Sequence, residues 1–231
     1  MVPISEFVNR VICGDSTEVM AAMPAGSVDL VVTDPPYGAR YRDRSGRSVA
    51  NDGDLAWLAP AFREAARVLK DDGFFVSFYG WHRAAEFLAA WKAAGLHPFA
   101  HFVWTKPYGS NARTARYVEY RHECAYLLVK HFYPPRIPPF ALRDVLPWDY
   151  TGNRRHPTEK PVSGIRPLIE AFSRRGDIVL DPFAGSGTTA VAAALSGRRY
   201  VAIELDARYC AVARERLPGT KVEATMMKPN R

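Results

Sequence analysis

The sequence predicts an α/β fold built on a mostly parallel sheet with helices on both faces. Three observations predict it. Apolar runs rich in β-branched and aromatic residues alternate with segments of helical periodicity along the chain. The 231 residues are enough for one full core of this kind. A glycine-rich segment also stands directly between an apolar run and a helical segment, as in the βα turns of such sheets.

The first half of the chain contains most of the predicted sheet. The run VDLVVT is apolar enough for a buried strand, and GFFVSFY begins another strand at Gly73. Leu55, Leu58 and Phe62 begin a series of apolar residues at helical spacing, and Gly95 marks the end of a second helix. Strands are expected at 10–14, 28–33, 73–79, 101–105 and 125–130, and helices at 54–70 and 83–94.

The second half is interrupted before the pattern resumes. Five prolines between residues 132 and 153 disfavour any regular element there. A helix is then expected at 162–172, a strand at 178–181, a helix ending at Leu195, a strand at 200–204 and a helix at 207–217. We therefore expect one domain over residues 1–217. The basic tail, residues 218–231, is expected to be flexible.

Composition limits the partners, the cellular location and the metal sites that we expect for the protein. Lys and Arg number 31 against 24 Asp and Glu, so the formal net charge is +7, which suits a polyanionic partner. No stretch approaches the about 20 apolar residues of a membrane helix, and the N-terminus lacks a secretion signal, so a soluble cytoplasmic protein is expected. The three cysteines stand singly, and we expect no metal site.

The glycine-rich segment VLDPFAGSGTTAVAAALSG predicts a ligand site. Gly185 and Gly187 allow the backbone to approach a ligand at the start of the following helix. Asp181 ends the preceding strand, where open α/β sheets bind ligands. Glu204 ends the next strand, a position from which its carboxylate can accept hydrogen bonds from both hydroxyls of a ribose.

Three classes of cofactor use such a turn. A nucleoside triphosphate is disfavoured, because Thr188 rather than a lysine follows Gly187. A nicotinamide cofactor matches the glycine spacing, but Asp181 would repel its pyrophosphate. S-adenosylmethionine is a cation that carries an ammonium group and no phosphate, so the same carboxylate attracts it. On this segment alone S-adenosylmethionine is only modestly favoured over the other two.

A second constellation, Asp34-Pro35-Pro36-Tyr37, follows the strand VDLVVT directly. Prolines fix the backbone and remove N–H donors, which leaves carbonyl oxygens as acceptors. An exocyclic amine of a base is a poor nucleophile, because its lone pair is delocalised into the ring. The Asp34 carboxylate and the Pro35 carbonyl can each accept one N–H, which frees the lone pair for attack on a methyl donor.

The same groups stabilise the reaction as it proceeds. Positive charge develops on the nitrogen, and a placed polar partner of this kind contributes roughly 3 kcal/mol to lowering the barrier. Tyr37 offers a flat ring on which a base flipped out of the duplex would stack.

These residues resemble the family of DNA amino-methyltransferases, in its beta-type motif order. The Asp-Pro-Pro-Tyr segment precedes the glycine turn, and the resemblance extends over most of the chain, from about Arg10 to Leu217. It implies a single catalytic domain with a Rossmann-like S-adenosylmethionine-dependent methyltransferase fold and a circularly permuted motif order. It also implies a short DNA-recognition insert at about 107–155. Further matching segments are CGDS (13–16), NDGD (51–54), FVWTKPYG (102–109) and HPTEKP (156–161).

The resemblance also implies roles for individual residues. Asp15 would contact the adenine ring of S-adenosyl-L-methionine, and the strand at 10–14 would lie beside the strand at 200–204. Phe183, the glycines and Thr188 would line the cofactor. Thr158 and Lys160 would approach its methionine end, although Lys160 also fits a plain surface lysine before a helix.

Arginines with interleaved aromatics follow Tyr37 and recur on two later loop segments, where they suit contacts to a phosphate backbone. We expect duplex DNA as partner, with a homodimer left open, and methylation of the adenine amine at a short or relaxed site. Alternatives are cytosine at its exocyclic amine, RNA, a catalytically idle DNA-binding protein and, remotely, a nicotinamide-dependent oxidoreductase. The arginines and aromatics are Arg40, Arg42, Arg44, Arg47, Arg113, Arg116, Arg121, Arg136, Arg143, Arg154, Arg155, Tyr41, Tyr108, Tyr117 and Trp148.

Overall fold

A computed structural model describes residues 2–39, 41, 46–47, 49, 51–107, 109, 117–130 and 136–217. The predicted tail and part of the expected arginine-rich loop segments lie outside these residues. The described elements are η1 (Ile4–Glu6), β1 (Arg10–Cys13), α1 (Ser16–Ala22), β2 (Val28–Thr33), α2 (Leu58–Val68), β3 (Leu69–Phe78), η2 (Trp81–Arg83), α3 (Ala84–Ala93), β4 (His97–Thr105), β5 (His122–Val129), β6 (Val145–Pro147), α4 (Val162–Phe172), β7 (Ile178–Asp181), α5 (Thr188–Leu195), β8 (Arg199–Glu204) and α6 (Ala207–Glu215).

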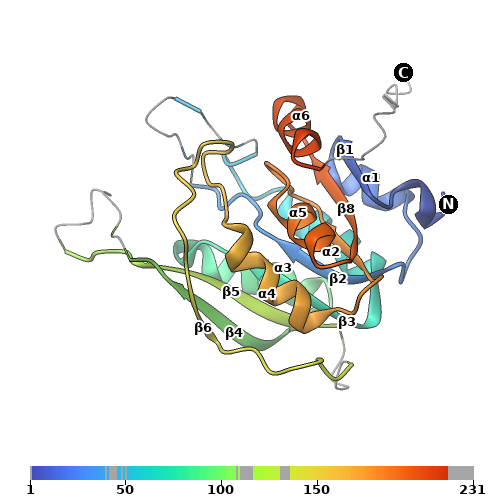
Figure 1. Ribbon diagram of the computed structural model, residues 1–231, viewed down its shortest axis with the longest axis horizontal. Coiled ribbons are helices and arrows are strands. Elements are labelled where there is room, and N and C mark those ends of the chain that lie inside the picture. The colour runs from blue at the N-terminus through green and yellow to red at the C-terminus, as the bar shows by residue number, and fades with distance from the viewer. Residues whose placement is uncertain are drawn as a thin grey trace.

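The strands form one sheet in the order β1-β8-β7-β2-β3-β5-β4-β6 (Figure 1). Strands β1, β8, β7, β2 and β3 are parallel to their neighbours, and β5 runs antiparallel between β3 and β4. The first strand pairs with the last, with Cys13 opposite Glu204. The predicted α/β fold and the pairing of the two chain ends are therefore confirmed.

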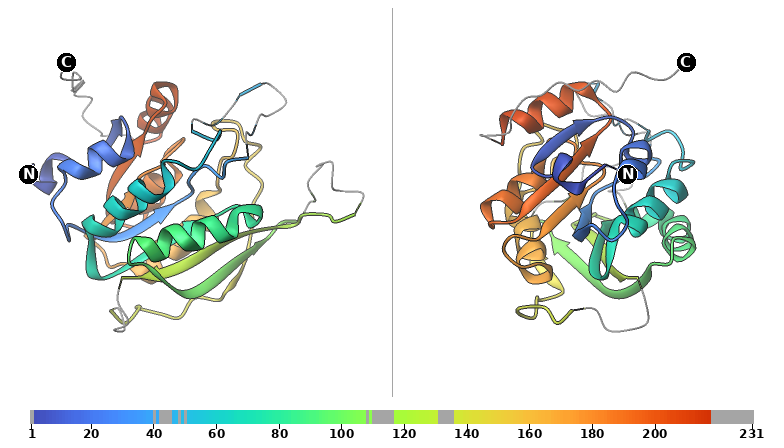
Figure 2. Two further views of the ribbon diagram at one scale, coloured as in Figure 1. Left: turned by 180° about the vertical axis from the view of Figure 1, so that it is seen from behind. Right: turned by 90° about the vertical axis from the view of Figure 1, so that its right-hand side faces the viewer.

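Helices pack on both faces of this sheet and give it two apolar layers (Figure 2). Helices α1, α2 and α3 cover one face, and α4, α5 and α6 cover the other. Alternate residues of β3 divide between the layers, because side chains along a strand point to opposite faces. Phe74 and Val76 pack under α4, whereas Phe75 packs under α2. No helix among the described residues is long and apolar enough to cross a bilayer.

Two elements differ from the prediction. Helix α1 was not expected, and it begins because Asp15 caps it: its Oδ1 accepts hydrogen bonds from Thr17 N and Glu18 N, at 2.8 and 3.2 Å. Strand β6 lies inside the segment where the prolines were expected to prevent regular structure, so that prediction was wrong. It is an edge strand that pairs with β4 alone, and a sheet edge tolerates Pro147.

Several boundaries also moved by a few residues. Helix α2 begins at Leu58 rather than Asp54, and β4 extends back to His97 across a register shift after Pro98. Helix α4 and strand β7 have the predicted bounds. Strands β2, β7 and β8 end side by side at Thr33, Asp181 and Glu204, so the two sequence constellations meet at one edge of the sheet.

Candidate active site

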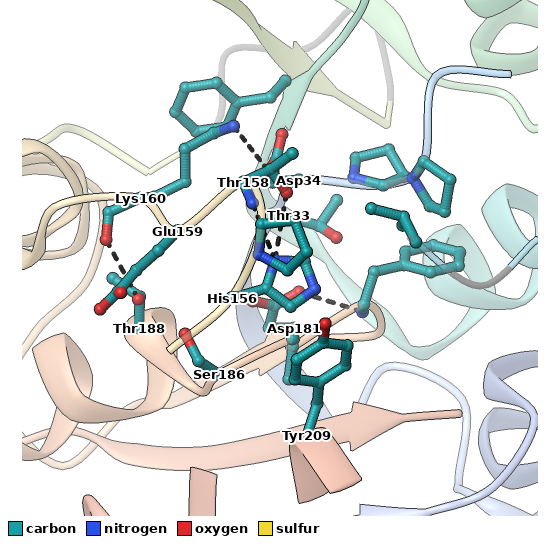
Figure 3. Close-up of a pocket in the computed structure, with 18 of the residues that line it drawn as sticks. Thr33, Asp34, His156, Thr158, Glu159, Lys160, Asp181, Ser186, Thr188 and Tyr209 are labelled. Atoms are coloured by element: carbon teal, nitrogen blue, oxygen red, sulfur yellow. Dashed lines mark hydrogen bonds and ion pairs between the residues drawn. The ribbon is translucent and has the colours of Figure 1, made fainter. Parts of the chain in front are cut away.

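A cavity of about 460 Å³ opens at the carboxyl ends of these parallel strands. The Asp-Pro-Pro-Tyr turn after β2 forms part of its wall, and the glycine bend between β7 and α5 forms another part (Figure 3). All but one of the predicted site residues line it: Asp15, Asp34, Pro35, Pro36, Tyr37, Thr158, Lys160, Asp181, Phe183, Gly185, Thr188 and Glu204.

The exception is Gly187, which has a different reason for being glycine. Its φ is +80°, and an added Cβ would lie 2.8 Å from the Cβ of Ala213 in α6. Gly187 therefore permits close packing of the bend on α6 rather than close approach to a ligand. Gly185 has φ +52° and does face the cavity, where His156 lies above it at 3.4 Å from an added Cβ.

Asp181 is a buried carboxylate at the floor of the cavity. Burial raises its pKa to about 7, although hydrogen bonds from Thr189 and from the Phe183 N–H oppose the rise. Among the described residues no lysine, arginine or histidine forms an ion pair with it. A cationic ligand group would supply the missing partner, whereas a pyrophosphate would be repelled.

Glu204 braces the glycine bend. Its Oε2 accepts a hydrogen bond from Gly185 N and its Oε1 accepts one from Asp206 N, both at 2.8 Å. Burial raises the pKa of this carboxyl, while the backbone donors lower it. Each oxygen still has acceptor capacity toward the cavity, so the carboxylate can hold the bend and bind hydroxyl groups at once.

The remaining residues around the glycine bend are held in place by contacts with neighbouring side chains. Phe183 packs edge-on against Trp57, with the ring centroids 4.8 Å apart. The Thr188 hydroxyl donates to the Lys160 carbonyl at 3.1 Å, which ties α5 to the HPTEKP segment. The Thr158 hydroxyl lies 3.2 Å from His156 Nδ1. Burial lowers the pKa of His156 to about 4, so its ring is neutral near pH 7.

In the part of the cavity beside the Asp-Pro-Pro-Tyr turn, both carboxylate oxygens of Asp34 already have partners. Its Oδ1 accepts a hydrogen bond from the Tyr37 hydroxyl at 2.5 Å, and its Oδ2 lies 2.6 Å from Lys160 Nζ. Burial raises the pKa of Asp34, and Lys160 and Tyr37 oppose that rise. Lys160, expected at the methionine end of the cofactor, lines the cavity, and its ammonium pairs with the Asp34 carboxylate (Figure 3).

Lys106 and Glu123, to which sequence reasoning gave no role, form an ion pair beside the Asp-Pro-Pro-Tyr turn. Trp148 was expected among the DNA-contacting aromatics, but it is a buried wall of the cavity with 6% of its surface exposed. A signal for Glu123 existed, because a carboxylate is the second residue of the largely apolar strand β5. Asp52 was also given no role, yet its carboxylate accepts hydrogen bonds from Ala39 N and Tyr41 N and shapes the segment after Tyr37.

The expected DNA-contacting arginines divide into four groups. One group is exposed and consists of Arg121, Arg143, Arg154 and Arg155. Arg47 donates to Asn153 O at 2.9 Å and so ties two loops at the cavity mouth. Arg136 contradicts the expectation. It binds Asp29, Asp72 and Asp177 near the amino ends of β2 and β7, away from the cavity, and is a structural residue. Arg40, Arg42, Arg44, Arg113, Arg116 and Tyr108 lie outside the described residues.

The fold and this cavity together define a class of protein. A mostly parallel sheet with its first strand beside its last, a glycine bend with an acidic floor and an Asp-Pro-Pro-Tyr turn are the features of an amino-methyltransferase. A family model described as DNA methylase matches residues 28–137 and 140–215. The chain belongs to this family of DNA amino-methyltransferases, as the sequence resemblance predicted.

Individual relatives cover most of the chain. A protein of Escherichia coli K12 that carries the name methylase YubD is 54% identical over 90% of both chains. The DNA adenine methyltransferase YhdJ of the same organism is 27% identical over 90% of this chain and 82% of its own. The Thermus thermophilus protein TTHA0409, a DNA modification methylase by its description, was solved with S-adenosyl-L-methionine. It has a TM-score of 0.68 and 27% identity, over 91% of this chain and 95% of that one.

Proposed function

We propose that this chain transfers a methyl group from S-adenosyl-L-methionine to the N6 amine of adenine in duplex DNA. One observation carries the proposal: Asp34 and Pro35 line the same cavity as Asp181 and Glu204. A pair of acceptors for an amine thus stands beside a pair of carboxylates suited to a cationic nucleoside. Membership of the DNA methylase family supports DNA as the substrate.

The cofactor fits the donor set of the cavity. In this proposal Asp181 attracts the ammonium group of the methionine end, and Glu204 accepts hydrogen bonds from the ribose hydroxyls. Phe183 supplies an apolar wall, and Asp15, which lines the same cavity, is the proposed contact of the adenine ring. When bound, S-adenosyl-L-methionine supplies a methyl group activated by its positively charged sulfur.

The residues of the Asp-Pro-Pro-Tyr turn prepare the base. Asp34 and the Pro35 carbonyl each accept an N–H of the amine, which localises its lone pair on nitrogen. The Asp34 carboxylate then stabilises positive charge on that nitrogen, an electrostatic effect worth roughly 3 kcal/mol in such sites. Tyr37 orients Asp34 through its hydroxyl and presents its ring to the base. The methylated nitrogen is acidic enough to lose its proton afterwards without a strong base.

Adenine is favoured over cytosine on two grounds. Members of the family that act on cytosine more often carry serine where this chain has Asp34. The relative YhdJ is named as an adenine enzyme. The same pair of acceptors would serve the cytosine amine, so the choice of base is a separate claim from the choice of reaction.

The experiment is to incubate the protein with labelled S-adenosyl-L-methionine and unmethylated bacteriophage λ DNA, followed by mass spectrometry of the nucleosides. N6-methyladenine is the expected product. N4-methylcytosine alone would contradict the base assignment but keep the reaction. No methylated nucleoside, with the cofactor bound, would contradict the proposed reaction itself. A parallel titration with a nicotinamide dinucleotide is expected to show no binding.

A further inference from the structure

The reactive carboxylate is occupied in the base-free protein. Asp34 Oδ2 lies 2.6 Å from the Lys160 ammonium, and the two side chains are only 20% and 10% exposed. An amine that approached Asp34 would meet this ammonium at close range. Since the amine nitrogen becomes positive during methyl transfer, a fixed ammonium beside it opposes the reaction it should assist.

A second anion, Glu123, also acts on the Lys160 ammonium. Glu123, at the start of β5, lines the same cavity and is held there by Lys106. Its charge raises the pKa of Lys160, and Lys160 in turn lowers the pKa of Glu123, so the ammonium lies in the field of both carboxylates. Among the described residues beside the Asp-Pro-Pro-Tyr turn, negative and positive charges therefore alternate in the order Asp34, Lys160, Glu123 and Lys106.

The surroundings of Lys160 favour an ammonium that moves within a confined space. Its Nζ lies 5.4 Å from the ring centre of Phe78 and 5.9 Å from those of Tyr37 and Trp148. Aromatic faces attract a cation over a broad area and impose no single position on it. Lys106 Nζ lies 5.7 Å from the same Trp148 ring, so this tryptophan adjoins both ammonium groups.

We propose that Lys160 is a positioning residue that alternates between two carboxylates. It holds Asp34 in the base-free protein and turns to Glu123 when the target amine takes its place. Lys160 thereby keeps Asp34 charged and oriented until the base arrives, and Glu123 removes the ammonium from the nitrogen that becomes positive. The inference rests on the proposed function, because it assigns Asp34 to the amine.

A double-mutant cycle in kcat tests this dependence, with λ DNA and saturating S-adenosyl-L-methionine. Glu123→Gln removes the second anion with little change of shape, so Lys160 should stay on Asp34 and kcat should fall by about tenfold or more. In the Lys160→Met background the same substitution should change kcat by less than about twofold. Equal losses in both backgrounds, or no loss from Glu123→Gln, would overturn the proposal.

Two controls separate positioning from folding. The affinity of Glu123→Gln for the cofactor, measured by equilibrium dialysis, should equal that of the wild type. The effect of the substitution is then confined to kcat. Lys92, an exposed lysine on α3, provides the matched substitution Lys92→Met, which should leave kcat and its pH profile unchanged. In Lys160→Met the acid limb of the kcat profile should move to higher pH, because Asp34 loses the cation that opposes the rise of its pKa.

A measurement without turnover keeps the inference separate from the proposed function. Carboxyl ¹³C NMR follows the titration of Asp34 in the base-free protein. Glu123→Gln should lower the pKa of Asp34, and the decrease should be larger when Lys160 is present than in Lys160→Met. An ammonium that the two carboxylates share can move fully to Asp34 once Glu123 has lost its charge. Equal shifts would contradict sharing, whether or not the protein methylates DNA. Failure of the nucleoside assay alone would instead contradict the proposed reaction.

Discussion

At the scale of single residues, the carboxylates of the cavity differ in whether a cation accompanies them. Asp34 has Lys160 within 2.6 Å, whereas Asp181 has no ion-pair partner among the described residues. Burial without a cation raises the pKa of Asp181 to about 7. The folded protein thus holds this proton more tightly than the unfolded chain, so the stability contributed by Asp181 falls as pH rises from 3.8 through about 7.

The same raised pKa predicts pH-dependent cofactor binding. A cationic ligand prefers the ionised carboxylate, so affinity for S-adenosyl-L-methionine should rise between pH 5.5 and 7. The slope should approach tenfold for each pH unit, by about the linkage of a single proton. Calorimetry at pH 6 in buffers of different ionisation enthalpy should show release of a proton on binding. His156 is neutral throughout this range, because its pKa is lowered to about 4.

The matched variant is Asp181→Asn, which keeps the shape of the side chain and removes its charge. It should bind the cofactor weakly and with little dependence on pH over the same range. A wild-type affinity that stays flat from pH 5.5 to 7 would show that Asp181 does not meet the cationic end of the ligand. An undiminished pH dependence in Asp181→Asn would assign the titration to another group, with Glu204 the next candidate.

Residue types predicted which side chains line the cavity better than they predicted the partners of those side chains. Asp181 and Glu204 end recognisable strands and Asp34 directly follows one, so the sequence places all three at one edge of the sheet. Lys160 was expected near the cofactor and is paired with Asp34, because a long flexible side chain gives no directional signal in sequence. Arg136 resembled a loop arginine near DNA, yet three carboxylates from distant segments hold it. Such partners come together only after folding.

At the scale of elements, Asp15 combines two roles that one substitution cannot separate. It lines the cavity, and it caps α1 through hydrogen bonds to Thr17 N and Glu18 N. Asp15→Ala should lower the free energy of unfolding by about 1 kcal/mol, the usual cost of a lost cap. Asp15→Asn should keep the stability, because asparagine caps equally well.

The pair of variants then isolates the cofactor contact. If the charge of Asp15 contributes to binding, Asp15→Asn should weaken cofactor affinity at wild-type stability, as measured by dialysis and by thermal unfolding. If Asp15→Asn binds as tightly as wild type, Asp15 is a helix cap alone, and the expected adenine contact is wrong.

Elements with a long or strong pattern were predictable, and short ones were not. Helix α4 has apolar residues at helical spacing over three turns, and β7 adjoins the glycine bend, so their bounds matched. Helix α1 has only seven residues and depends on its cap, which periodicity does not detect. Strand β6 has three residues, and its backbone pairs with β4 rather than following an apolar pattern of its own.

At the scale of the whole molecule, the sheet joins the two ends of the chain. Strand β1 lies beside β8 (Figure 1). Asp15, two residues after β1, therefore lines the same cavity as Glu204 at the end of β8. This pairing was predictable because the motif order left the neighbour of β8 to be supplied from the N-terminus. The insert between β4 and α4 was only partly predictable, since β5 and β6 within it belong to the sheet.

The share of the insert that belongs to the sheet predicts a short or relaxed recognition sequence. Much of the segment at about 107–155 builds the sheet or the wall around Trp148, which leaves few residues to contact bases outside the cavity. Expression in a host without adenine methylation, followed by methylome sequencing, should show modification at a short motif with tolerated variants. A long, strictly recognised motif would require reading surfaces that the described residues do not provide.

The central claim is that Asp34 and the Pro35 carbonyl hold the target amine beside a bound methyl donor. Single-turnover methylation of λ DNA by Asp34→Ala, with cofactor affinity measured on the same sample, tests it most directly. Loss of a placed electrostatic partner predicts a rate lowered by about 100-fold or more, with affinity for S-adenosyl-L-methionine within a few-fold of wild type. A variant that methylates DNA at the wild-type rate would contradict the account.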